Sequence, residues 1–129
     1  MLLVKTKIGP SRINGIGLFA DQFIPQGLLT WKLTHGLDLK YPPQDLERLH
    51  EIARLTFLKH AYLSTRTGLY VLCSDDARFF NHSYEPNIGD TDCKDSDEGA
   101  DLALRDIVPG EELTCDYRAF DTRYLSGFS

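Results

Sequence analysis

Hydrophobic and polar residues alternate over short stretches along much of the chain, a pattern typical of half-buried strands. The segment Thr65-Arg66-Thr67-Gly68 reads as a hairpin turn, and Pro109-Gly110 lies in a second turn between apolar runs. Several short strands are therefore expected rather than long ones. The candidate strands are residues 2–7, 27–31, 62–63, 69–72, 102–104 and 112–115.

One helix is predicted. Pro42-Pro43-Gln44-Asp45 can open it, because proline is favoured in a first helical turn. The apolar residues that then recur at helical spacing are Leu46, Leu49, Ile52, Ala53 and Phe57. The expected fold class is therefore mostly β (α+β), with one clear helix.

Composition narrows the class of protein. The chain has 129 residues, 42% hydrophobic and 26% charged, which suits one core, so a single domain over residues 1–129 is expected. No apolar stretch approaches the roughly 18 residues that span a bilayer, and the first residues lack the apolar run of a signal peptide. Cys73, Cys93 and Cys115 form an odd set without a CxxC pair. We expect neither disulfides nor a metal site, and an intracellular location, cytoplasmic or nuclear.

The net charge of −5 is concentrated in residues 90–101, which hold six acidic residues and one lysine. Two interpretations stay open: a solvated loop, which is favoured, or a face that attracts a partner rich in Lys and Arg. A calcium loop is excluded, since the sixth position from Asp90 is Asp95, where an EF-hand needs glycine. The chain has no basic stripe, so no direct nucleic-acid binding is expected.

Three segments carry candidate chemistry. In Asn14-Gly15-Ile16-Gly17 the glycines would let a ligand approach the backbone, although on its own the segment is better explained as a plain turn. Residues 78–87, from Arg78 to Asn87, are dense in hydrogen-bonding side chains beside two phenylalanines. Residues 110–117 end in Asp116-Tyr117, a pair that alone is also common in cores.

Taken together and in this order, the three segments resemble the signatures of the SET-domain family of protein-lysine methyltransferases. Gly15-Ile16-Gly17 matches the Gly-x-Gly segment of the family, and residues 78–87 match Arg-Phe-x-Asn-His-Ser-x-x-Pro-Asn. Residues 110–117 match Gly-Glu-Glu-Leu-Thr-x-Asp-Tyr, and the resemblance runs from about residue 3 to about residue 120. It implies small twisted sheets around a knot-like core, with the Tyr117 segment passing through the loop near Asn81 and His82.

The resemblance also implies a protein-lysine N-methyltransferase that uses S-adenosylmethionine. Tyr117 would be the catalytic tyrosine. Residues 14–17 would offer backbone contacts to the donor, Asn81 and His82 would hold its two ends, and Arg78 would support the pocket. Tyr62 would face both donor and lysine. The residues implied for the donor pocket are Asn14, Gly15, Ile16, Gly17, Tyr62, Arg78, Asn81 and His82.

This chemistry needs no strong general base. A free lysine has a pKa of about 10.4, and a dry aromatic channel beside a cationic sulfonium disfavours its charged form. Holding the two reactants in line can then supply roughly 7–11 kcal/mol. The substrate is expected to be a lysine-bearing protein, a histone among the candidates.

Two departures from the family pattern limit what carries over. Tyr84 stands where many members carry a zinc-binding cysteine, and no cysteine follows Tyr117, so no structural zinc is expected. The lid over the lysine channel would then come from residues 118–129, which include Phe120, Tyr124 and Phe128. Cys115 stands where relatives carry Phe or Tyr, and its smaller side chain would leave room for higher methylation states.

Two other functions remain alternatives. One is a catalytically silent SET-like module that binds a lysine-bearing partner protein. The other is an acidic interaction protein that binds no methyl donor.

Overall fold

The computed structural model describes residues 1–124 of the chain. Within that range strands predominate, and most of them are between two and six residues long. The strands are β1 (Thr6–Pro10), β2 (Ile16–Ala20), β3 (Leu29–Lys32), β4 (Leu39–Tyr41), β5 (Tyr62–Leu63), β6 (Tyr70–Leu72), β7 (Asn81–His82), β8 (Ile88–Cys93), β9 (Ser96–Ala103) and β10 (Thr114–Cys115). The expectation of a mostly-β fold is confirmed.

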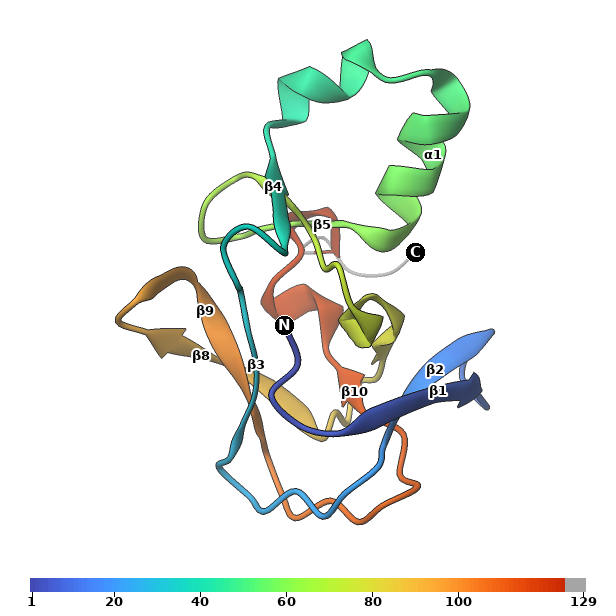
Figure 1. Cartoon of the computed structure of the whole chain (residues 1–129), viewed down its shortest axis with the longest axis vertical. Coiled ribbons are helices and arrows are strands. Elements are labelled where there is room, and N and C mark those ends of the chain that lie inside the picture. The colour runs from blue at the N-terminus through green and yellow to red at the C-terminus, as the bar shows by residue number, and fades with distance from the viewer. Residues whose placement is uncertain (125–129) are drawn as a thin grey trace.

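The strands form small separate sheets (Figure 1). The β1–β2 hairpin stands alone, β4–β6–β5 and β3–β9–β8 make three-stranded sheets, and β7 pairs with β10 in parallel. The predicted hairpin is confirmed, because Tyr62 pairs with Val71 and Leu63 with Tyr70 in antiparallel register. Gly68 supports its turn at a φ of 72°, a conformation that glycine adopts without steric cost.

The predicted single helix is wrong in its extent. A 3₁₀ helix, η1 (Pro43–Arg48), comes first, and the α-helix α1 (Glu51–His60) follows after a break. His50 causes the break: its backbone is extended, and its Nδ1 accepts the Ile52 N–H at 3.2 Å, which caps α1. No residue of α1 is buried, and Ile52 remains 64% exposed. The apolar residues that predicted one helix therefore belong to two consecutive helices, η1 and α1.

Three further 3₁₀ turns complete the elements: η2 (Asp76–Phe79), η3 (Tyr117–Ala119) and η4 (Thr122–Tyr124). None of the helices within residues 1–124 combines the length and apolarity that crossing a bilayer requires.

The acidic segment is not a loop, which corrects the favoured expectation. Residues 90–101 belong to the β8–β9 hairpin. Five of its six carboxylates meet the chain's own cations: Arg66 pairs with Asp90 at 2.8 Å and Asp92 at 2.7 Å. Lys40 lies 2.9 Å from both Asp97 and Glu98, and Lys32 pairs with Asp95. Because these charges are engaged internally, the hairpin offers little free acidity to a basic partner.

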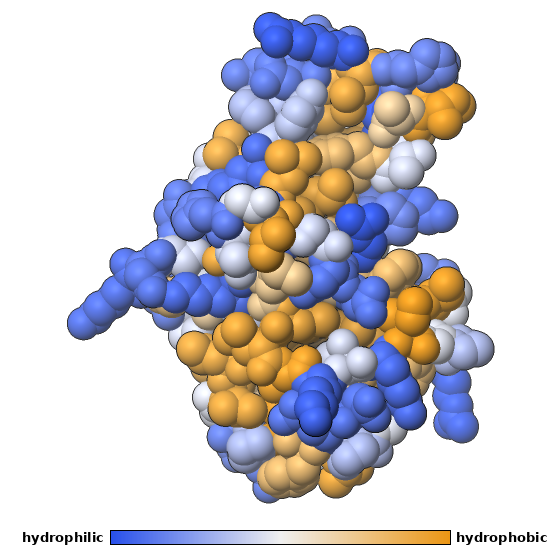
Figure 2. Space-filling model, in the orientation of Figure 1, coloured by the Kyte–Doolittle hydropathy of each residue, from blue (hydrophilic) through white to orange (hydrophobic). Residues whose placement is uncertain are grey.

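Within residues 1–124 the hydrophobic core is divided into three clusters of buried side chains, which surround the site described below. One cluster, built around Leu18, Ile88 and Leu113, lies beneath β2, β8 and β10. A second contains Trp31, Val71 and Cys73, and a third packs beneath the helical segment. Apolar side chains also reach the surface in both halves of the molecule (Figure 2). Elements distant in sequence are thereby held around a shared interior.

Candidate active site

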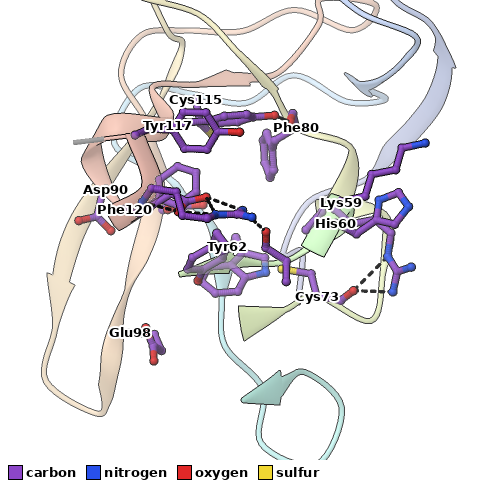
Figure 3. A pocket seen from close by; sticks show the side chains of 18 residues that line it. Lys59, His60, Tyr62, Cys73, Phe80, Asp90, Glu98, Cys115, Tyr117 and Phe120 are labelled. Atoms are coloured by element: carbon purple, nitrogen blue, oxygen red, sulfur yellow. Dashed lines mark hydrogen bonds and ion pairs between the residues drawn. The ribbon is translucent and has the colours of Figure 1, made fainter. Parts of the chain in front are cut away.

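A cavity opens where β5, η2 and the segment after β10 meet (Figure 3). With its open mouth it encloses about 770 Å³, within the range of pockets that hold small molecules. Its wall is strongly aromatic. The aromatic residues that line it are Trp31, Tyr62, Phe80, Tyr117, Phe120 and Tyr124.

Tyr117 is fixed by three kinds of contact. Its hydroxyl donates to the Phe80 carbonyl oxygen, and its backbone N–H donates to His82 Nδ1 at 3.1 Å. Its ring packs against Phe120, 5.8 Å between centroids, and against Tyr124 at 5.4 Å. Burial raises the pKa of the Tyr117 hydroxyl well above its ordinary value, so the group stays a neutral donor at physiological pH.

Tyr62 enters the same cavity from β5. Its ring meets Phe120 edge-on at 4.9 Å, so Phe120 contacts both Tyr62 and Tyr117. Burial raises the pKa of the Tyr62 hydroxyl as well. A wall built this way keeps water away from whatever enters, which strengthens electrostatic interactions inside it.

One edge of the cavity is cationic. Arg78 lies there and donates from Nε and Nη2 to the Cys73 carbonyl at 3.2 and 2.9 Å. Arg123 is held by Asp121 at 2.8 Å and donates to the Ala61 carbonyl at 2.5 Å, which ties η4 to the end of α1. Burial, with Arg78 nearby, lowers the pKa of His60, so the imidazole stays neutral at this edge.

The Gly-x-Gly and Asn-His segments meet in a separate network beside the cavity. Asn81 is 6% exposed, and its Nδ2 lies 2.9 Å from Glu112 Oε2 and 3.1 Å from both Ser11 Oγ and the Asn14 carbonyl. The Ser11 hydroxyl donates to the same carboxylate at 2.8 Å. A Cβ on Gly17 would lie 2.5 Å from Glu112 Oε2, so only glycine fits there without a shift.

His82 and Asn87 place the strand that leads to Tyr117. Asn87 Oδ1 accepts the Thr114 N–H at 2.9 Å, and Asn87 Nδ2 donates to the Glu112 carbonyl at 2.8 Å. Burial lowers the pKa of His82, and because its Nδ1 accepts a hydrogen bond, the ring proton sits on Nε2. Residues 78–87 thus position residues 110–117, the segment that ends in Tyr117.

The structure separates the predicted site residues into two groups. Tyr62, Arg78 and Tyr117 line the cavity. The others do not line the cavity within residues 1–124: the segment Asn14, Gly15, Ile16 and Gly17 meets Asn81 in the network, and His82 bonds instead to the Tyr117 N–H. Their contact with a donor remains a prediction.

Several cavity and network residues were not predicted. Glu112 lies inside the third motif, so its place in the sequence could have drawn attention to it. Ser11 was not singled out, and Trp31 and Asp101, which line the cavity from β3 and β9, were noted only as parts of a candidate strand and of the acidic segment.

The departures from the family pattern also have places in the structure. Tyr84 is 59% exposed, with the Arg118 guanidinium 4.6 Å from its ring centroid. Cys115 is buried in the cavity wall. Phe128, expected in the lid, lies outside the described residues. Residues 1–124 contain no group of three or more His, Cys, Asp or Glu that could hold a metal ion.

Comparisons with known proteins agree with this geometry. The sequence model of the SET domain matches residues 15–118. A provisional histone methyltransferase of Plasmodium falciparum is similar in structure, with a TM-score of 0.60, 17% identity, and coverage of 90% of this chain and 95% of that one. The Neurospora SET-domain protein DIM-5, a histone lysine methyltransferase, has a TM-score of 0.58 and 22% identity, covering 90% of this chain and 53% of that one.

A chain of apo ctPRC2 gives a TM-score of 0.67 at 25% identity, over 92% of this chain and 16% of that one. No curated protein sequence matches at a significant level. The SET-domain model covers most of the chain. This chain therefore belongs to the SET-domain family.

Proposed function

We propose that this chain is a protein-lysine N-methyltransferase that transfers a methyl group from S-adenosylmethionine to a lysine side chain of a protein. The observation that carries the proposal is the aromatic cavity in which Tyr62 and Tyr117 both pack against Phe120. Membership of the SET family supports methyl-transfer chemistry. The name of DIM-5, a histone lysine methyltransferase, supports lysine as the acceptor and a histone as one candidate substrate.

The residues present fit a methyl donor of this kind. A cavity of about 770 Å³ with its mouth can hold a nucleoside-sized molecule together with the end of a lysine side chain. Arg78 and Lys59 at its cationic edge suit the carboxylate of an amino-acid moiety. Tyr62 and Arg78 would hold the donor from the cavity, and the backbone of residues 14–17 with Asn81 and His82 would complete its site. When bound, S-adenosylmethionine supplies an electrophilic methyl group on a cationic sulfonium.

The chain's own residues prepare the amine. Trp31, Tyr62 and Phe120 exclude water from the cavity, and loss of water lowers the pKa of a lysine that enters. Tyr117 presents an oxygen whose position is fixed by its bond to the Phe80 carbonyl. Weak C–H···O contacts to such oxygens contribute about 0.5–1 kcal/mol each and can orient a methyl group. Catalysis then comes mainly from alignment.

The experiment is a donor-binding titration together with transfer of labelled methyl groups to core histones and to proteins of a cell extract. A methyltransferase binds S-adenosylmethionine and labels a protein on lysine. The silent SET-like module would bind a lysine-bearing partner without labelling it. The acidic interaction protein would bind no donor, and the engaged charges of the β8–β9 hairpin already count against it.

We also infer the setting in which the enzyme acts. Residues 1–129 would form one SET domain, with a lysine-bearing protein as partner and no direct nucleic-acid contact. Cys73, Cys93 and Cys115 are free thiols, which suits an intracellular, reducing compartment. We propose no structural zinc, since Tyr84 stands where many family members carry a zinc-binding cysteine.

A further inference from the structure

Two unpartnered polar groups face the cavity from neighbouring strands. Trp31 on β3 lies opposite Asp101 on β9 in antiparallel register, so their side chains share one face of the sheet. Trp31 is 4% exposed, and its Nε1 has no hydrogen-bond partner within residues 1–124. In the same range, neither a hydrogen-bond donor nor a cation pairs with the Asp101 carboxylate. Because buried polar groups are normally satisfied, the unpartnered Trp31 Nε1 indicates that this wall, which also presents the half-buried Asp101 carboxylate, meets a ligand.

The charged groups around Asp101 leave it without a cation of its own. Asp90 of β8 is its partner in register, and Arg66 binds Asp90 at 2.8 Å rather than Asp101. The other titratable groups near the carboxylate are Tyr62, Cys73, Cys115 and the more distant N-terminal amine. Burial and the Asp90 charge together raise the pKa of Asp101 to about 8.

Asp101 also belongs to the wall between two cavities. A second cavity, lined in part by Pro86 and Ala119, shares Asp90, Asp101, Cys115 and Phe120 with the first, and of the two shared carboxylates only Asp90 is paired with a cation within residues 1–124, Arg66. A carboxyl group in a shared wall can receive a proton on one side and release it on the other. The position therefore suits proton transfer as well as binding.

We propose that Asp101 binds the substrate ammonium in the cavity and accepts the proton that the ammonium must lose before methyl transfer. This role rests on the proposed lysine methyltransferase function. In the first step the N–H bond breaks, the proton joins an Asp101 oxygen, and a neutral amine and a neutral carboxyl group result. In the second, the amine lone pair forms the N–C bond while the C–S bond breaks with its electron pair on sulfur. The Asp101 proton then passes to water.

The acidity of Asp101 suits both parts of this role. An ammonium beside the carboxyl group favours its charged form, so the incoming lysine itself ionises Asp101. Proton transfer is most efficient when donor and acceptor have similar pKa values near the working pH. A desolvated lysine and a carboxyl group whose pKa is raised by burial meet that condition better than an ordinary aspartate would.

The first test uses n-butylamine, a mimic of the lysine side chain, titrated calorimetrically into the full chain. Asp101→Asn keeps the shape and removes the charge, so binding should weaken about tenfold or more. Asp97→Asn is the matched control, because Asp97 is an exposed carboxylate of the same strand paired with Lys40, and it should bind n-butylamine as wild type does. Equal binding by Asp101→Asn and Asp97→Asn would overturn the proposal.

A second measurement needs no variant. Carboxyl carbon NMR of the wild-type protein should show the titration midpoint of Asp101 falling when n-butylamine is added, and an unchanged midpoint would contradict the ammonium site.

The proton step is tested by the pH profile of methyl transfer to core histones. Asp101→Asn should move the midpoint of kcat upward by about 1–2 pH units, toward the lysine value of about 10.4, with donor affinity unchanged. An unmoved midpoint would overturn the proton step. A wild-type chain that binds n-butylamine through Asp101 but labels nothing at any pH would refute the proposed function and leave the ammonium site standing.

Discussion

Asn81→Ala should destabilise the protein and loosen the Gly-x-Gly segment at the same time. The side chain is 6% exposed, and its Nδ2 lies near four acceptors, which belong to Ser11, Asn14, Ile16 and Glu112. Two amide protons can serve at most two of these acceptors. One bond to the Glu112 carboxylate contributes about 1.5–3 kcal/mol and one neutral bond about 1 kcal/mol. The free energy of unfolding should therefore fall by about 2.5–4 kcal/mol.

Asn14→Ala is the matched control for this change. Asn14 joins the network through its backbone carbonyl, which alanine keeps, so its substitution should change stability by less than about 0.5 kcal/mol. Urea denaturation measures both variants, and calorimetry with S-adenosylmethionine should show weaker donor binding only for Asn81→Ala. If the two variants unfold alike, Asn81 does not anchor the segment.

Three more outcomes follow from the same structure. Gly17→Ala should destabilise the protein by about 1–3 kcal/mol, because the new Cβ would lie 2.5 Å from Glu112 Oε2. Gly9→Ala is the control and should be tolerated, because its Cβ would lie 3.7 Å from its nearest neighbour; thermal melting of both variants measures the difference. With a pKa of about 8 in the folded protein, Asp101 loses its proton at a higher pH than it does in the unfolded chain. The free energy of unfolding therefore falls as the pH rises from about 4 to 8. Asp101→Asn removes that loss, and its advantage over wild type in denaturation should grow across this window, approaching roughly 5 kcal/mol above pH 8, while a constant difference would count against the buried carboxylate. Elemental analysis should find no stoichiometric zinc, and one zinc per chain would reveal a site that the cysteine pattern does not predict.

The sequence predicted what depends on neighbouring residues. The Tyr62–Tyr70 hairpin was foreseen because its turn signal, ending at Gly68, lies inside four consecutive residues. The helix was foreseen in place but not in extent, because apolar spacing does not register a side-chain cap such as that of His50. Local signals therefore located elements better than their ends.

What the sequence could not predict depends on contacts between distant segments. The acidic stretch looked like a loop because Arg66 and Lys40, which pair with its carboxylates, lie far away along the chain. Motif matching brought out Asn81, but its anchoring role emerges only when Ser11 and Glu112 fold onto it. Asp101 was noted only as one charge of the acidic segment, since its place in the cavity comes from lying opposite Trp31.

The central claim is tested most directly by transfer of labelled methyl groups from S-adenosylmethionine to core histones and cell-extract proteins, with wild type and Tyr117→Phe compared. The substitution removes one hydrogen bond to the Phe80 carbonyl, worth about 1 kcal/mol, so the variant should stay folded and bind the donor. Wild type should label protein lysines, and Tyr117→Phe should lose at least about tenfold in turnover, because the lost contact acts mainly in the transition state. A Phe variant with wild-type turnover would remove Tyr117 from catalysis, and a wild-type protein that labels nothing would contradict the assignment as a methyltransferase.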